Sequence, residues 1–388
     1  MSRSGSRVSK RRQALAMCGL LLTVAGGPVA QAQEEDASEA PAPKPAEMAP
    51  RAPFELLLDV ERRGDGFAAV GVRGHALTSE DGLNWTQAEV PVRATLTAVD
   101  FVDEDRGWAV GHAATILATT DGGRTWTIQN YEPSLETPFL DVVFTDDQTG
   151  FAVGAYDLFY KTRDGGETWT EYEPQLSMGG WHLNSMVALD DGTLVIAGET
   201  GLLSKSTDGG ETWDLIEAPY SGTFFGIRQL GPQGLLLFGL RGHAFVTDDV
   251  ASLPVLPPDT DLGYQFKLPP SMEKDAEEAK ESGGAEAEEE ALAEAERKAA
   301  EEKAAESEWD VVDNDKSVLS LFGGTQTADG GYVLVGVNGR IWVSDDGGPK
   351  ARRLPNPREG GLTDVVETAD GDLLFVGENG AFLYKRNR

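Results

Sequence analysis

One short motif returns along this chain at nearly regular intervals. The pattern Asp-Gly-Gly-x-Thr-Trp stands at Asp121–Trp126, Asp164–Trp169 and Asp208–Trp213, with a degenerate copy at Asp81–Trp85. A short apolar stretch ending in glycine precedes each copy, and three more such stretches follow without a good motif. Their glycines lie 40, 43, 44, 41, 97 and 41 residues apart, at Gly71, Gly111, Gly154, Gly198, Gly239, Gly336 and Gly377. Periods of about 40–45 residues indicate a seven-bladed β-propeller with one insertion.

Each repeat divides into four short strands. Residues 140–144 are typical of an inner strand, 107–111 of a second and 115–119 of a third, while the fourth begins at the tryptophan. The sequence therefore predicts an all-β fold with four-stranded antiparallel blades over residues 54–388. The last repeat stops after its third strand, at Phe382–Tyr384, so we expect a strand near Arg51–Leu56 to close the ring.

The N-terminal residues have the pattern of an export signal. A basic head precedes the apolar run Ala14–Val24, and Ala30-Gln31-Ala32 fits a cleavage site, so residues 1–32 are predicted to be a signal peptide. Ordinary secretion fits better than twin-arginine export at Arg11-Arg12, and Met17 before Cys18 argues against a lipoprotein. Residues 33–53 are predicted to be a disordered tether rich in Ala, Pro and Glu. The mature protein is then periplasmic or secreted.

Composition narrows the classes of partner. The formal charge of −32 argues against nucleic acid and anionic membrane surfaces. The apolar run of the signal is too short to span a bilayer, so no membrane insertion is expected after cleavage. Cys18, the single cysteine, lies in the signal, which leaves the mature chain without a disulfide or a cysteine metal site. We expect a monomer.

The insertion is predicted at residues 257–310, between blades 5 and 6. Residues 273–308 contain 15 acidic and 5 basic side chains, and Ala, Glu and Lys favour helix. Leu292 is the one large apolar residue of the helical run, so we expect a solvated, partly helical arm. Three roles stay open: a solubilising insertion, an electrostatic contact for a basic partner, and a cation-binding lid.

The repeated motif, an Asp-box, has the composition of a tight turn. Its aspartate can accept backbone hydrogen bonds, its glycines permit positive φ, and its tryptophan can wedge between sheets. A catalytic role for these aspartates is disfavoured. The residues predicted to be structural are Asp81, Trp85, Asp121, Gly123, Trp126, Asp164, Gly166, Trp169, Asp208, Gly210 and Trp213.

The succession D-V-x-F, G-F/W-A-V-G and T-x-D-G-G-x-T-W resembles the photosystem II stability/assembly factor family of seven-bladed propellers. The resemblance is clearest over Leu96–Trp126, Leu140–Trp169 and Met186–Trp213. It implies an exported, non-enzymatic scaffold without cofactors that binds a protein partner, such as a membrane-protein or exporter complex. The photosystem client itself does not follow from it, because the chain is far more acidic than an arginine-rich docking patch would make it.

Propeller topology sorts the unusual residues by ring end. The turn between second and third strands faces the same end as the links between blades, whereas the Asp-boxes face the other. All four histidines map to the first end, here called the histidine end. We predict a partner-binding face there, with Trp181, Phe224 and Phe225 as apolar anchors, although these aromatics could instead plug the channel. The predicted face comprises Arg73, His75, His112, Phe139, Tyr156, Trp181, His182, Phe224, Phe225, Arg241, His243 and Arg340.

Two chemical alternatives concern residues at the same end. Arg73-Gly-His-Ala76 recurs as Arg241-Gly-His-Ala244, but these repeats are not neighbours in a ring of seven, so a repeated turn is favoured over a metal site. A carbohydrate-active or glycan-binding propeller is the rival function, since sialidases also carry Asp-boxes. Sialidases need an arginine cluster and a tyrosine nucleophile, and Tyr156 beside Asp157 would point away from it in a strand. We therefore expect no enzyme activity.

Overall fold

The computed structural model describes residues 42–172, 180–257, 260, 262, 285–315 and 317–386. All of them belong to one unit, Ala40–Arg388. The predicted signal peptide at 1–32 and the first part of the predicted tether lie outside the described residues. No helix among those described is long and apolar enough to cross a membrane.

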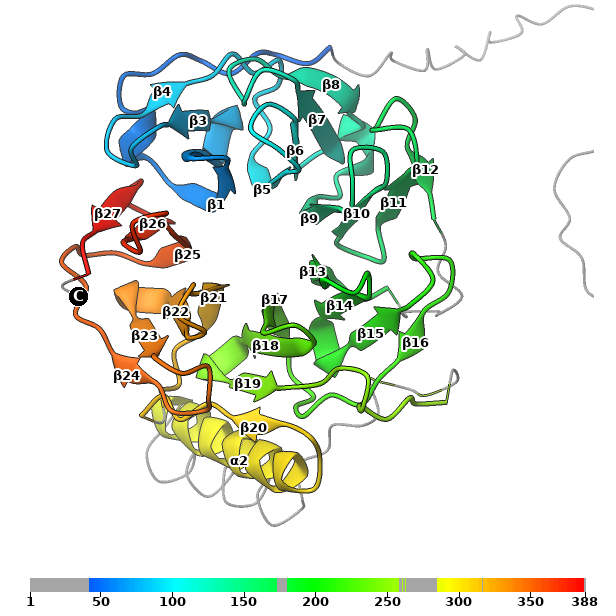
Figure 1. The fold of residues 1–388 in the computed structure, drawn as a ribbon, viewed down its shortest axis with the longest axis vertical. Coiled ribbons are helices and arrows are strands. Elements are labelled where there is room, and N and C mark those ends of the chain that lie inside the picture. The colour runs from blue at the N-terminus through cyan, green and yellow to red at the C-terminus, as the bar shows by residue number, and fades with distance from the viewer. Residues whose placement is uncertain are drawn as a thin grey trace, which may run out of the picture. The chain divides into compact units, whose positions relative to one another are not determined.

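Seven small antiparallel sheets form a closed ring, which confirms the predicted fold (Figure 1). Blade 1 contains β1 (Leu57–Arg63), β2 (Gly66–Gly71), β3 (Ala76–Ser79) and β4 (Thr86–Gln87). Blade 2 contains β5 (Leu96–Phe101), β6 (Gly107–Gly111), β7 (Thr115–Thr119) and β8 (Thr127–Asn130). Blade 3 contains β9 (Phe139–Phe144), β10 (Gly150–Gly154), β11 (Phe159–Thr162) and β12 (Thr170–Glu171).

The second half of the ring follows the same plan. Blade 4 contains β13 (Leu183–Ala188), β14 (Leu194–Gly198), β15 (Leu203–Ser206) and β16 (Asp214–Leu215). Blade 5 contains β17 (Phe224–Leu230), β18 (Gly234–Gly239), β19 (Ala244–Thr247) and β20 (Asp310–Val311). Blade 6 contains β21 (Leu321–Gln326), β22 (Tyr332–Gly336), β23 (Ile341–Ser344) and β24 (Arg352–Arg353), and blade 7 contains β25 (Leu362–Glu367), β26 (Leu373–Gly377) and β27 (Phe382–Tyr384).

The core lies between neighbouring blades. In each blade, the second strand is buried along its whole length, because adjacent sheets cover both of its faces. Between blades 2 and 3, for example, Trp108 stacks on Phe144 with the ring planes 10° apart. This packing accounts for the continuous apolar stretches before the landmark glycines.

The turns after four of these second strands share one backbone conformation. Short 3-10 turns, η2 (Val72–Gly74), η4 (Glu199–Gly201), η5 (Leu240–Gly242) and η7 (Val337–Gly339), each carry a central residue with positive φ. Two of these residues are Arg73 and Arg241, at φ 58° and 54°. The repeated Arg-Gly-His-Ala sequence is thus a repeated turn. The other short 3-10 helices are η1 (Ala52–Phe54) and η3 (Pro133–Leu135).

Ring closure differs from the expectation. Residues 52–54 form η1 instead of a strand, because Pro53 cannot donate to a ladder, and among the described residues nothing pairs with the outer edge of β27. Blade 7 therefore keeps three strands. The ring closes through side-by-side packing of β1 and β25, where the Thr363 hydroxyl donates to the Leu57 carbonyl at 2.8 Å.

The described end of the predicted tether packs against blade 1. The amide of Ala46 donates to the carbonyl of Val90 at 2.9 Å, and that of Ala49 donates to the Gln87 side chain at 2.7 Å. The predicted boundary at Phe54 consequently does not mark the start of packed chain.

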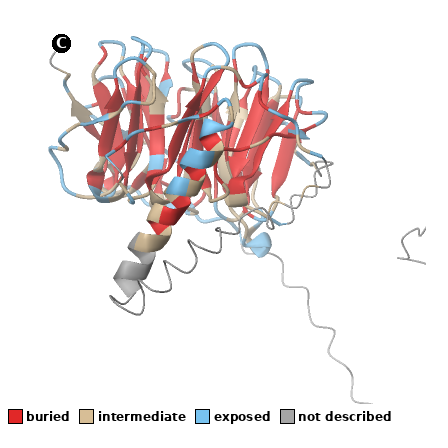
Figure 2. Ribbon diagram, turned by 90° about the horizontal axis from the view of Figure 1, so that it is seen from below, coloured by how far each residue is buried: buried red, intermediate tan, exposed pale blue. Residues whose placement is uncertain are grey.

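The insertion lies inside blade 5, which corrects its predicted place between blades 5 and 6. Strand β20 pairs with β19, with Val311 opposite Phe245, so the insertion replaces an Asp-box turn and leaves from the Asp-box end. It contains α2 (Ala285–Ala305), which runs along the outer side of the ring (Figures 1 and 2).

Helix α2 is docked on blade 5 over part of its length. Ala300 and Ala304 are buried against the apolar cluster of blades 4 and 5, together with Trp309. Buried Glu296 accepts the Tyr220 hydroxyl at 3.0 Å and pairs with Arg241. The expectation of a solvated arm is wrong for this part of the helix, because small alanines allow close approach without large apolar side chains.

Candidate functional site

The centre of the ring holds a cavity of about 770 Å³ that the inner strands of all seven blades line. Each inner strand has a β-bulge at the same place, just after its first residue. A bulge redirects the side chain of the extra residue. One residue per blade therefore lines the cavity at its histidine-end mouth: Leu58, Thr97, Leu140, Asn184, Phe225, Phe322 and Thr363.

Apolar residues dominate one part of this mouth. Phe225 and Phe322, from adjacent blades 5 and 6, have ring centroids 5.5 Å apart, and Phe322 is 41% exposed. Three polar residues of the mouth instead connect neighbouring blades by hydrogen bonds. Thr97 donates to the Phe139 carbonyl at 2.8 Å, and Asn184 donates to the Phe224 carbonyl at 2.7 Å. The third, Thr363, makes the closing contact described above.

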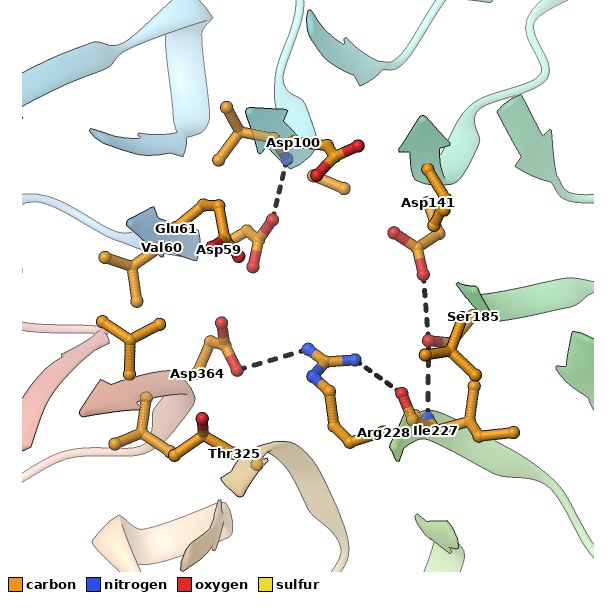
Figure 3. Close-up of a pocket in the computed structure, with 18 of the residues that line it drawn as sticks. Asp59, Val60, Glu61, Asp100, Asp141, Ser185, Ile227, Arg228, Thr325 and Asp364 are labelled. Atoms are coloured by element: carbon orange, nitrogen blue, oxygen red, sulfur yellow. Dashed lines mark hydrogen bonds and ion pairs between the residues drawn. The ribbon is translucent and has the colours of Figure 1, made fainter. Parts of the chain in front are cut away.

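Below the mouth, carboxylates occupy one half of the wall (Figure 3). They come from four consecutive blades, 7, 1, 2 and 3, and are Asp364, Asp59, Glu61, Asp100 and Asp141. Asp59, Asp141 and Asp364 share one register position, opposite the residue before the landmark glycine. Glu61 and Asp100 lie two residues further along, on the same strand face.

Three of these aspartates each hydrogen-bond their own blade to the next one in the ring. Asp59 accepts the amide of Val99 at 2.7 Å, Asp100 that of Phe144 at 2.6 Å, and Asp141 that of Met186 at 2.8 Å. The inner edge of a blade has no strand partner, so these amides need an acceptor. A carboxylate has more acceptor sites than one amide fills, which leaves capacity facing the channel.

The wall raises the pKa of its acids. Burial, followed by repulsion from Asp100 and Asp59, raises the pKa of Glu61 to about 8. Burial likewise raises the pKa of Asp100 to about 7 and that of Asp141 to about 6. Burial and repulsion from Asp364 raise the pKa of Asp59 well above its usual range.

Arg228 reaches the acids from blade 5 (Figure 3). Its guanidinium lies 3.5 Å from the Oδ1 atom of Asp364 and donates to the Ile227 carbonyl at 2.9 Å. Burial acts to lower the pKa of Arg228. Four surrounding acids outweigh burial and raise this pKa above its usual value: Asp364, Asp141, Asp59 and Glu61. One cation thus faces five carboxylates, and sequence reasoning missed the whole group. The D-V-x-F signature already carried the signal, since Asp141 is its first residue.

The predicted partner-binding face is divided by the structure. Phe139 and Phe224 are fully buried between blades and cannot serve as surface anchors, because the bulge turns the residue after them to the channel instead. His75 and His243 are also buried. His243 packs on Tyr220 with ring centroids 4.2 Å apart, and burial lowers its pKa to about 4.

The other predicted residues lie nearer the surface. Tyr156 is 69% exposed and meets the half-buried ring of His182 edge-on at 4.8 Å. Trp181 packs partly on the core of blades 3 and 4. His112 is exposed and Arg340 is half-buried. Arg73 pairs with Glu55 at 3.1 Å, and Arg241 is engaged by α2.

The Asp-boxes form hydrogen-bonded turns. Asp121 accepts the amides of Arg124 and Thr125 at 3.0 and 2.9 Å, and the Thr125 hydroxyl at 2.7 Å. Asp164 and Asp208 bind Thr168 and Thr212 in the same way. Gly123, Gly166 and Gly210 have positive φ, Trp126 and Trp213 are buried, and Trp85 and Trp169 are half-buried. Asp81 repeats the pattern through Leu83 and Asn84.

Across the described part of the chain, no three His, Cys, Asp or Glu side chains are arranged to hold a metal ion. The channel carboxylates are instead distributed around half a ring. Their arrangement suits hydrogen bonding to an extended cationic group.

Comparisons place the chain beside known propellers. Residues 77–136 and 128–253 match the family model described as photosynthesis system II assembly factor YCF48. The chloroplastic photosystem II stability/assembly factor HCF136 of Guillardia theta is 36% identical over 67 residues, which is 16% of this chain and 17% of the relative. The assembly protein Ycf48 of Thermosynechococcus vestitus is 39% identical over 51 residues, 13% of this chain and 15% of the relative. The matched stretches thus span under a fifth of these relatives.

Solved structures extend the likeness to the whole ring. YCF48 bound to D1 peptide superimposes with a TM-score of 0.56 at 16% identity, covering 90% of this chain and 100% of that one. YCF48 from Cyanidioschyzon merolae gives 0.57 at 17% identity, covering 89% and 98%. The GH74 enzyme of Niastella koreensis gives 0.57 at 13% identity, covering 85% and 52%. At such identities the likeness concerns the fold alone.

Proposed function

We propose that this chain, a seven-bladed Asp-box propeller of the photosystem II assembly factor type, is an exported, non-enzymatic scaffold for assembling a membrane-protein complex. It binds a segment of a partner protein at the histidine-end mouth of its channel. The basic head and apolar run at the N-terminus support export, and we propose the periplasm as the place of action.

The observation that carries the proposal is the bulge shared by all seven inner strands. It turns one side chain per blade toward the mouth, and two adjacent blades present the partly exposed pair Phe225 and Phe322. Aromatic side chains beside an open cavity are typical interface anchors. The solved YCF48 propeller with its D1 peptide supports a polypeptide as the class of ligand.

The test is crosslinked capture from host membrane extracts with the purified chain from Gln33 onward. The variant Phe225→Ala/Phe322→Ala should recover about tenfold less of one membrane-protein partner than the parent, because aromatic anchors carry much of an interface's binding energy. The matched control is Leu83→Ala/Ile128→Ala, which removes two exposed apolar side chains, 62% and 37% exposed, away from the channel. Equal capture by the two variants would contradict the proposed site.

A further inference from the structure

We propose that the bound partner segment places a basic side chain, arginine or lysine, among the channel carboxylates Asp59, Glu61, Asp100, Asp141 and Asp364. The inference rests on the proposed function and names the chemistry that the segment must carry. It also predicts an orientation, with an apolar side chain over blades 5 and 6 and the basic one toward blades 7, 1, 2 and 3.

Acidic groups strongly outnumber basic groups in the cavity. Its charged lining residues are six acids and two arginines: Asp59, Glu61, Asp100, Asp141, Asp364, Glu367, Arg62 and Arg228. Glu367 pairs with Arg386 at 3.2 Å, and Arg62 is exposed and hydrogen-bonds back to Glu61 through its own amide. Arg228 is then the cation that faces five carboxyl groups, and a further cation beside them would favour their ionised forms.

The burial and hydrogen bonding of the Asp364 carboxylate also favour a bound cation. Its side chain is only 6% exposed and points into the channel (Figure 3). Asp364 shares a side-chain hydrogen bond with neighbouring Asp59 and faces the Arg228 guanidinium, which stands 3.5 Å from its Oδ1 atom. Within the described part of the chain, the Oδ1 atom itself is left without a hydrogen bond. A buried carboxylate oxygen without a donor is costly, so this atom is a ready acceptor for a ligand N–H group.

The geometry favours an organic cation over a metal ion. A metal ion needs several ligands converging at about 2–2.6 Å, and no described group of three acidic or histidine side chains converges in this way. A guanidinium has five donors on a planar group and an ammonium has three, so either can bridge carboxylates from neighbouring blades.

Apolar anchoring and charge occupy opposite sides of one cavity. Phe225 and Phe322 stand on blades 5 and 6, while the five carboxylates occupy the other side, and all of these residues line the same space. An extended peptide can contact both sides with residues near in sequence, because successive side chains point in opposite directions.

A short peptide pair tests the inference on the intact mature chain. The probes are acetyl-Phe-Arg-Arg-Arg-amide and its analogue with citrulline, the neutral counterpart, at each arginine. We expect the arginine peptide to bind at least tenfold more tightly. In Glu61→Gln/Asp141→Asn its affinity should fall about fivefold to tenfold, whereas Asp65→Asn/Glu104→Gln, which removes two carboxylates from exposed loops, should change it less than twofold. Equal losses in both variants, or equal binding of both peptides, would overturn the inference.

Calorimetry of the parent chain avoids any effect of the substitutions on folding. A cation among acids whose pKa values are raised must displace part of their protons, so binding at pH 7 should release protons into the buffer. Binding without proton release would place the peptide elsewhere. If Phe225→Ala/Phe322→Ala loses its partner while both peptides bind alike, the scaffold function stands and this inference fails.

Discussion

The aspartates of the Asp-boxes and those of the channel are one residue type in two opposite settings. Hydrogen bonds from the backbone and side chain of Asn84 lower the pKa of exposed Asp81 to about 2. Burial raises the pKa of Asp100, in the channel, to about 7. The boxes repeat from blade to blade, whereas the channel position changes from Asp59 to Ala98 and Ser185. Local turn contacts thus set the chemistry of the box aspartates, whereas burial in the ring sets that of the channel aspartates.

Removing a box aspartate gives the largest expected effect. Asp121→Ala deletes the acceptor for two amides and the Thr125 hydroxyl, and should lower the free energy of unfolding by about 2–3 kcal/mol. Denaturant unfolding measures the loss. Partner capture per folded molecule should stay unchanged, and Asp65→Asn serves as the surface control. A fall in capture without a fall in stability would make the boxes part of the site.

Glu296 of α2 is buried like the channel acids, but the fold itself supplies its partners. Glu296→Ala loses the Tyr220 hydrogen bond and the Arg241 ion pair, and should weaken docking of α2 by about 1–2 kcal/mol. Hydrogen exchange across residues 285–305 should rise several-fold, with exchange in blades 1 to 3 unchanged. Glu302→Ala on the same helix is the control. Unaltered exchange would show that α2 docks through its alanines alone.

The pH dependence of stability gives the prediction with the clearest sign. The pKa of Glu61 is about 8 in the folded chain against 4.5 for an ordinary glutamate, so the folded chain binds the proton more tightly. Stability should therefore fall as pH rises from about 4.5 to 8, and Asp100 and Asp141 act in the same direction below that limit. Glu61→Gln should make the fall shallower by up to one proton. Urea midpoints between pH 5 and 8 measure it, and an unchanged slope would contradict the raised pKa.

The sequence predicted what repeats. Seven glycines and four Asp-boxes established blade number, strand order and the two ring ends, because each depends on local turn chemistry. It missed what depends on contacts between blades. The bulge buries Phe224 and turns Phe225 to the channel. Composition cannot show which of the two is buried, since both are phenylalanine.

The docking of α2 and the place of the insertion also depend on contacts that the sequence does not reveal. Alanines such as Ala300 and Ala304 gave no amphipathic signal, yet their small size permits α2 to dock. The insertion was assigned to the wrong link because β20, only two residues long, is too short to recognise before its pairing with β19 is known. The D-V-x-F pattern was visible, but only the ring brings its aspartate, Asp141, within electrostatic range of Arg228 and Asp59.

Site-specific photocrosslinking tests the central claim most directly. A benzophenone amino acid is introduced at position 322 in the channel mouth or at position 83 in an Asp-box turn, and each protein is irradiated with the membrane extract. We expect a partner adduct from position 322 and none from position 83. Adducts from position 83 alone would mean that the box end is the binding face and the acidic channel is only part of the architecture.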